Sequence, residues 1–403
     1  MDFAGKQYYK LNRLLLLSLG LWPYQNSILK KIQIVFFQTL FLSFFLPQLN
    51  TFFVRQYNID LFIKVMVFMV VNSIYIIKYN AFLLFTDNIR YIFERIQRDW
   101  NMLKSQAELK IIKKYAKNAR LYTIQFFTLV IFFMLSYIVL NCIPIILNVI
   151  VPKNESRSRP ILITMEFFVD QDTYFYAILT YSFLINYAGC VTVVAVATIL
   201  IAYALHTCAL FKITSYRIEQ IFDKSVLQEP ENIKQHIFYE KLIYAVYIHR
   251  RAMDLANILT NSFTIFYFVL LGFGVALMSL SLYHLYNALI LMVDPFELLM
   301  SSGIITLELY YIFLGNYVGQ DVIDTSTEIC EITYSIPWHI APLWMQKSLL
   351  FVMQRSGRRS ALTAGGLFQA SLEGFAMLMS ASISYVMLLL SVRTQQKKPS
   401  EEL

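Results

Sequence analysis

A stripe of polar side chains runs along the last apolar stretch of the chain, from Leu367 to Val392. Its polar members recur at spacings of seven, four and seven residues: Glu373, Ser380, Ser384 and Ser391. In a helix these positions lie on one side. Polar groups are costly in hydrocarbon, so the stripe suits a helix that lines water or packs on a partner. We expect a pore-lining face, and helix packing through small residues is the alternative.

This stretch is the last of seven apolar runs that are each long enough for a bilayer, which needs about 20 helical residues. Hydrophobic residues make up 58% of the 403 residues and charged residues only 15%, which excludes an ordinary soluble globular protein. The sequence therefore predicts an all-α polytopic membrane protein with seven transmembrane helices. The expected spans are Ile32–Phe53, Leu61–Leu84, Tyr122–Leu147, Tyr174–Ala204, Asn261–Leu285, Leu298–Tyr317 and Leu367–Val392.

The distribution of Lys and Arg predicts the orientation of these spans. Of the 34 basic residues, 25 lie in the N-terminal segment and in the connections that would share its side. We therefore expect a cytoplasmic N-terminus and an extracellular C-terminus. The sequon at Asn154 falls in an expected outer loop, where it would accept an oligosaccharide. The net charge of +8 then reflects topology, and no nucleic-acid partner is predicted.

These spans and charges divide the chain into seven expected parts. The parts are a cytoplasmic N-terminal segment (1–31), helices 1–4 with cytoplasmic extensions (32–204), a cytoplasmic helical platform (205–260), helices 5 and 6 (261–317), a cytoplasmic segment with a helix before the pore (318–366), the pore-lining helix (367–392) and an extracellular tail (393–403).

Enzyme chemistry has weak support in the sequence. His249 and Asp254 show a His-x4-Asp spacing, but five residues apart on a helix they point to different sides. The four cysteines are scattered without metal-ligand spacing. We predict no catalytic residue, no metal and no cofactor.

Several short motifs lie in the C-terminal third. They are Gly315-Asn316 after the sixth span, Ile336-Pro337-Trp338, Ser371-Leu372-Glu373 and Ser384-Tyr385. Together with the seven-span pattern, they resemble the insect odorant receptor family. The second inner loop lacks the long insertion of the obligate co-receptor, so the chain looks like a ligand-tuning subunit. The end of the last span also lacks the final Gln-Phe pair of the related gustatory receptors.

The resemblance implies a cation channel gated by a small volatile odorant and embedded in the plasma membrane of a sensory neuron. It implies a hetero-oligomer, expected to be a tetramer, with olfactory co-receptor subunits. Aligned on Tyr385, the hydrophobic gate positions are Leu388 and Val392, and Ser391 is the polar position at the pore mouth. Glu373 and Ser384 are further expected pore positions.

The resemblance also implies an odorant pocket in the outer half of the membrane, between the second, third, fourth and sixth spans. Apolar and aromatic walls with a few polar groups suit such a site. The residues expected to form it are Val71, Ile74, Tyr75, Ser136, Val139, Leu140, Thr180, Phe183, Leu184, Ile304, Leu307, Glu308 and Tyr311. A carboxyl at Glu308, near the middle of a span, is a functional candidate by default. Its alternative is a protonated Glu bonded to a neighbouring Tyr.

Two other classes of membrane protein remain as alternatives. A G-protein-coupled receptor would have an external N-terminus, an Arg-containing triplet after the third span and an outer disulfide. The charge distribution opposes the first feature, and Cys142 has no cysteine partner in 148–173. A transporter would be expected to show an internal repeat, and none is evident.

The predicted topology has a direct test. A C-terminal epitope tag should be labelled by antibody on intact cells, and an N-terminal tag only after permeabilisation, because the basic connections stay in the cytoplasm. Labelling of the N-terminal tag on intact cells would instead favour the G-protein-coupled alternative.

Overall fold

The computed structural model describes residues 4–401, except 57, 151–164, 168, 172 and 291–294, and leaves the side chains of 144–149, 295–296 and 394–401 undescribed. The predicted glycosylation site, Asn154, lies outside the described residues. The elements are η1 (Lys6–Tyr8), α1 (Lys10–Ser18), α2 (Ile28–Ser43), α3 (Phe45–Val54), α4 (Ile59–Leu84), α5 (Thr86–Met102), α6 (Gln106–Ile150), α7 (Phe175–Glu219), η2 (Gln220–Phe222), α8 (Lys224–Leu227), α9 (Glu231–Ile290), α10 (Pro295–Ser335), η3 (Trp338–Ile340), α11 (Leu343–Ser356), β1 (Thr363–Ala364), β2 (Phe368–Gln369) and α12 (Leu372–Glu401).

Seven helical segments in the described part of the chain are long and apolar enough to cross a membrane. This confirms the predicted seven-helix, all-α architecture. The first span differs from the expectation in being broken at Phe44, where α2 ends and α3 begins. Pro47 lies in the first turn of α3, where a missing backbone N–H is tolerated.

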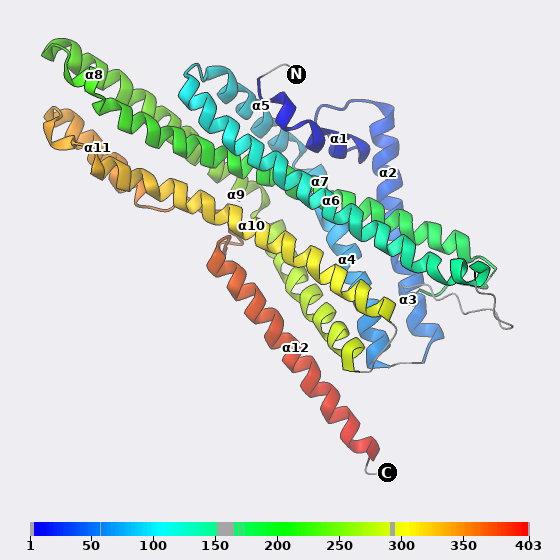
Figure 1. Ribbon diagram of the computed structural model, residues 1–403. Coiled ribbons are helices and arrows are strands. Elements are labelled where there is room, and N and C mark those ends of the chain that lie inside the picture. The colour runs from blue at the N-terminus through cyan, green and yellow to red at the C-terminus, as the bar shows by residue number, and fades with distance from the viewer. Residues whose placement is uncertain are drawn as a thin grey trace.

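Helix α7 forms the centre of the bundle, and α6, α9 and α10 run alongside it (Figure 1). In its most hydrophobic stretch of 18 residues, 94% of the stretch is buried, whereas only 6% of the corresponding stretch of α12 is buried. The middle of α7 is rich in small residues, such as Ala195, Ala202 and Ala209, which let neighbouring backbones approach closely. Helix α12 instead lies at the outside of the bundle (Figure 1).

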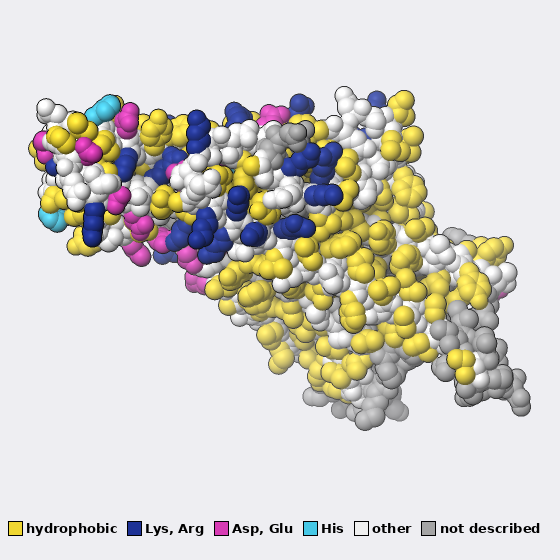
Figure 2. Space-filling model, turned by 45° about the horizontal axis from the view of Figure 1, so that its top comes forward, with side chains coloured by type: hydrophobic (Ala, Val, Ile, Leu, Met, Phe, Trp, Pro, Cys, Tyr) yellow, Lys and Arg dark blue, Asp and Glu magenta, His cyan; other side chains and the backbone are white. Residues whose placement is uncertain are grey.

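Several of the long helices continue beyond the hydrophobic part of the molecule. Lys and Arg side chains gather on the elongated part that leads towards α8 and α11, whereas the remainder of this face is largely hydrophobic (Figure 2). The helical platform predicted for 205–260 consists of the end of α7 with η2 and α8, followed by the start of α9. The expected helix before the last span is α11.

Buried ionic contacts join the helices in this elongated part. Asp99 of α5 is almost fully buried, accepts a hydrogen bond from Arg251 Nε of α9 at 2.6 Å and contacts His206 Nε2 of α7 at 3.1 Å. Arg217 of α7 donates to Glu108 of α6 at 2.6 Å. Buried charges need such partners, since the loss of solvation is otherwise uncompensated.

The segment before α12 departs from the sequence expectation. The last span was expected to begin at Leu367, but α12 begins at Leu372 and is preceded by an antiparallel hairpin of β1 and β2. Gly365 and Gly366 have φ of 61° and 70°, a backbone conformation that glycine adopts without strain. The backbone N–H of Gly365 donates to Thr264 O of α9 at 3.1 Å, so the hairpin is attached to α9.

Asp99→Asn should destabilise the protein by about 3–5 kcal/mol, because it leaves the Arg251 guanidinium without its buried counter-charge. The melting temperature of the detergent-solubilised protein measures this effect. Asp254→Asn is the matched control: Asp254 pairs with Arg95 at 3.2 Å, but its side chain is 59% exposed. We expect the control to cost less than about 1 kcal/mol. Equal melting temperatures for the two variants would contradict a stabilising role for the Asp99 cluster.

Candidate functional site

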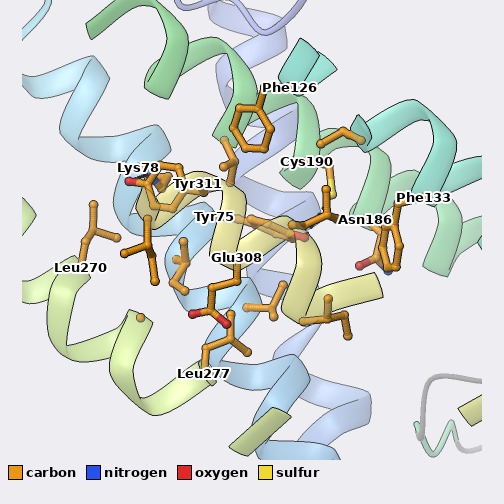
Figure 3. Close-up of a pocket in the computed structure, with 18 of the residues that line it drawn as sticks. Tyr75, Lys78, Phe126, Phe133, Asn186, Cys190, Leu270, Leu277, Glu308 and Tyr311 are labelled. Atoms are coloured by element: carbon orange, nitrogen blue, oxygen red, sulfur yellow. Dashed lines mark hydrogen bonds between the residues drawn. The ribbon is translucent and has the colours of Figure 1, made fainter. Parts of the chain in front are cut away.

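An internal cavity of about 160 Å³ lies between α4, α6, α7, α9, α10 and α12. Most of its wall is aliphatic or aromatic, and several of its side chains are drawn in Figure 3. The residues that line it are Phe68, Val71, Ile74, Tyr75, Lys78, Phe126, Val130, Phe133, Met134, Tyr137, Asn186, Cys190, Val193, Tyr267, Leu270, Leu271, Gly274, Val275, Leu277, Met300, Ile304, Leu307, Glu308, Tyr311, Ile312, Leu378 and Ser382. A mainly apolar space with a few polar groups is typical of a small-molecule site.

Glycines on facing helices support the aromatic walls of the cavity. The Tyr75 ring of α4 lies so close to Gly189 of α7 that a Cβ there would be 2.0 Å from the ring. Phe133 of α6 packs in the same way over Gly303 of α10, at 2.5 Å from the equivalent position. A side chain at either glycine would displace the ring, so these glycines fix the shape of the cavity.

Two pairs of side chains in the wall are joined by polar contacts. Lys78 Nζ, from a buried lysine, donates to Tyr311 Oη at 2.6 Å and lies 4.1 Å from the Tyr311 ring centroid. The Tyr75 hydroxyl is 3.5 Å from Cys190 Sγ. The Lys78–Tyr311 pair therefore combines a charge-assisted hydrogen bond with a cation–π contact.

Glu308 differs from these groups. Its side chain projects from α10 into the space near Leu277 (Figure 3). The residue is 8% exposed, and neither carboxyl oxygen has a hydrogen-bond partner in the described part of the chain. The predicted alternative of a Glu bonded to a neighbouring Tyr is thus not the arrangement in this structure, since Tyr311 is bonded to Lys78 instead.

Seven of the thirteen residues expected to form the pocket line this cavity. They are Val71, Ile74 and Tyr75 of α4 and Ile304, Leu307, Glu308 and Tyr311 of α10. The other six do not line it: Ser136, Val139, Leu140, Thr180, Phe183 and Leu184.

Helical phase explains why Ser136, Val139 and Leu184 do not line the cavity. The wall of the cavity from α6 is formed by Phe126, Val130, Phe133, Met134 and Tyr137. Positions two residues further on, where Ser136 and Val139 lie, are turned by about 200° around the helix. Val139, Thr180 and Leu184 are exposed on the outside of the bundle, and Ser136 and Thr180 donate to backbone carbonyls of their own helices. Leu140 and Phe183 pack in a neighbouring apolar cluster.

The sequence reasoning also missed whole parts of the wall. Helix α9 contributes Tyr267, Leu271 and Gly274, although the fifth span was not expected to border the pocket. Lys78 carried a usable signal, because a lysine inside an apolar span is rare and usually functional. The small residues of α9 carried no comparable signal.

The polar stripe of α12 is exposed along its length. Its members are Glu373, Met377, Ser380, Ser384, Leu388 and Ser391, and Val392 beside them is also exposed. The face that packs on the bundle carries Gly374, Leu378 and Ser382. Ser382 contributes its backbone carbonyl to a 3.2 Å hydrogen bond from Ser279 Oγ of α9. Leu378 and Ser382 also line the cavity, so the cavity reaches the last helix directly.

His249 and Asp254, weighed above as an enzyme-like pair, have separate partners. His249 is buried and contacts the Phe211 ring, and Asp254 pairs with Arg95. Burial, together with the positive charge of Arg355, lowers the pKa of His249 to about 4. The imidazole is therefore neutral at pH 7 and serves as a packing group between α7 and α9.

Comparison with known proteins assigns the family. A family model described as the 7tm odorant receptor matches residues 58–383. The chain belongs to the odorant receptor family. Odorant receptor 85f of Drosophila melanogaster is 30% identical to the receptor over 92 residues, which span 21% of this chain and 24% of that relative.

Solved structures show the same fold. The olfactory receptor OR5 of the insect Machilis hrabei, in complex with eugenol, superposes with a TM-score of 0.79 at 12% identity, covering 96% of this chain and 98% of that chain. The OR5 structure described without eugenol gives a TM-score of 0.78 over the same shares. The predicted resemblance to insect odorant receptors is confirmed.

Met134→Trp should reduce the size of the ligands that the receptor accepts, because Met134 lines the cavity. Overfilling a packed space costs about 1–3 kcal/mol, which is roughly a five- to hundredfold loss of affinity for the largest ligands. The thermal stabilisation of the purified receptor by ligands of increasing size measures this loss of affinity. Leu135→Trp, on the exposed side of the same helix, is the control and should change nothing. The same size limit in both variants would place the binding site elsewhere.

Proposed function

We propose that this receptor is the ligand-tuning subunit of an odorant-gated, non-selective cation channel. The observation that carries the proposal is the contact between the cavity and α12. Leu378 and Ser382 belong to the wall of the cavity and to the helix that bears the polar stripe. A ligand in the cavity therefore touches the last helix, and it favours an open state if it binds that state more tightly.

The ligand of this site is a small volatile molecule of mainly apolar character. Its binding is driven by burial of apolar surface against the aromatic and aliphatic wall. The cavity is lined by residues of the apolar, membrane-spanning parts of the helices. If the basic, elongated end of the molecule is cytoplasmic, the opposite, hydrophobic end faces outwards (Figure 2). That orientation follows from the Lys and Arg distribution, and it makes Asn154 an extracellular glycosylation site.

The pore is formed by α12 together with the equivalent helices of partner subunits. Glu373 and Ser384 face the water-filled path, and Leu388 and Val392 form a hydrophobic gate with Ser391 at its mouth. The exposed stripe supports this arrangement, since polar groups facing lipid are unfavourable. A narrow apolar ring closes such a path by dewetting. Co-receptor subunits complete the ring in a heterotetramer in the plasma membrane of a sensory neuron.

The end of α12 has a second link to the walls of the cavity. Arg393, next to the gate position Val392, lies 3.6 Å from Asp60 at the start of α4 and hydrogen-bonds Asn287 near the end of α9. Helices α4 and α9 both border the cavity. A ligand that shifts either helix would thus act on the gate residues through Arg393 as well as through Leu378.

Leu388→Ser should raise the current that flows without ligand, because a hydroxyl in the apolar ring stabilises water in the neck. Leu390→Ser is the matched control, since Leu390 is on the less exposed side of the same helix. Both variants are recorded with the co-receptor at matched surface expression, with and without an odorant panel. Partner subunits share the ring, so we expect a partial effect.

Two results would refute the proposal. Equal basal currents for the two variants would show that the gate does not lie on this face of α12. Ligand responses that persist when ion flow is blocked, but vanish when G-protein signalling is inhibited, would show that the protein is a G-protein-coupled receptor and not a channel.

A further inference from the structure

Glu308 is a buried carboxyl group that has no partner within the described part of the chain. Both of its oxygens are enclosed and neither accepts a hydrogen bond. Buried polar groups in folded proteins are almost always paired, so an unpaired one requires an explanation. Because its carboxyl group projects into the cavity (Figure 3), the missing partner is expected to come from a molecule bound there.

The space beside the carboxyl group is kept open by a glycine. A Cβ built on Gly274 of α9 would lie 3.9 Å from Glu308 Oε1 and 4.0 Å from Ile312 Cδ1. This is ordinary van der Waals contact, so a methyl group would fit there, and its absence leaves room next to the carboxyl oxygens. Gly274 also lines the cavity. The carboxyl group therefore has an approach from inside the cavity.

Resting on the proposed ligand-gated function, we infer that Glu308 accepts a hydrogen bond from a hydroxyl group of the ligand. The ligand class is then a small apolar alcohol or phenol, whose hydrocarbon body packs on the wall while its O–H donates to Glu308. A site built to bond a ligand hydroxyl discriminates strongly against analogues without one, because its own polar group is otherwise left unpaired.

A neutral donor suits this cavity better than a cationic one. Lys78 is buried in the same wall and carries a positive charge that is held by Tyr311. An amine ligand would bring a second positive charge into an enclosed space of low dielectric constant, where charges of equal sign repel strongly. A hydroxyl group fills the vacant hydrogen bond without that repulsion.

The test uses matched pairs of ligands: an alcohol or phenol and its methyl ether, which keeps the shape but cannot donate. Currents are recorded from the full-length receptor with the co-receptor. In the unmodified receptor the hydroxyl member should act at about tenfold lower concentration than the ether. Glu308→Gln keeps a carbonyl acceptor of similar size and should preserve the preference. Glu308→Leu removes the acceptor and should abolish it, while responses to the ethers persist.

Two further variants separate a role in recognition from a role in folding. Gly274→Ala leaves Glu308 in place but occupies the space beside its carboxyl group, so it should reduce the preference for the hydroxyl member. Thr306→Val changes the exposed side of α10, where Thr306 bonds only its own helix among the described contacts, and should leave the preference unchanged. Ether-evoked currents in Glu308→Leu show that this variant folds and opens.

The outcomes distinguish this inference from the function on which it rests. Equal potencies within every pair in the unmodified receptor, or a preference that survives Glu308→Leu, would overturn the role of Glu308 and leave the channel intact. Protonated amines that act more strongly than the alcohols through Glu308 would overturn the assignment to neutral donors. Failure of all ligands to evoke current at normal surface expression would instead contradict the proposed channel.

Discussion

The position of the last helix depends on how its first turn is capped. The first backbone N–H groups of a helix have no partner within the helix and must find one elsewhere. Here Asn316 and Gln320 of α10 accept from the N–H groups of Ser371 and Leu372 at 3.1 and 3.3 Å, and the Ser371 hydroxyl accepts from Gly374 at 3.0 Å. The start of α12 is thus fixed to α10, and Arg393 near its far end contacts Asp60 of α4 and Asn287 of α9. The Gly-Asn motif that suggested the family contributes one of these capping groups.

Helix α10 both lines the cavity and supplies the groups that cap α12. Tyr311 lines the cavity, and it also borders a second cavity of about 170 Å³ on the side of the hairpin. Asn316, five residues further on, lines that second cavity and caps α12. Helix α10 therefore connects the cavity to the start of the last helix, in addition to the direct contact through Leu378 and Ser382. Because packed cores move between discrete arrangements and do not deform continuously, a small displacement of α10 at Tyr311 would reach the base of α12.

The sequence was sufficient to predict the membrane-spanning helices. It was insufficient to predict which side of each helix faces the cavity. Seven spans were predictable because a bilayer demands long apolar helices. The expected site residues of α4 and α10 do line the cavity, and among them Tyr75 and Glu308 stand out from aliphatic neighbours. The phase of α6 was not predictable: it is apolar almost all round in its membrane part, so no periodicity separates Met134, which faces the cavity, from Leu135, which faces outwards. The hairpin at Gly365 was missed because its two-residue strands are too short to show alternation.

The two interpretations of the α12 stripe concern different faces of the helix. Packing through small residues predicts close contact at the stripe, yet the small residues in contact with the bundle are Gly374 and Ser382, on another side of the helix. Within the described part of the chain the stripe stays uncovered, and Leu388 in it is 57% exposed. If the whole helix faced lipid, its hydroxyl groups and the carboxyl of Glu373 would lack solvation. Either water or a partner subunit must therefore face this side. A ring of subunits around a pore satisfies both demands with the same surface.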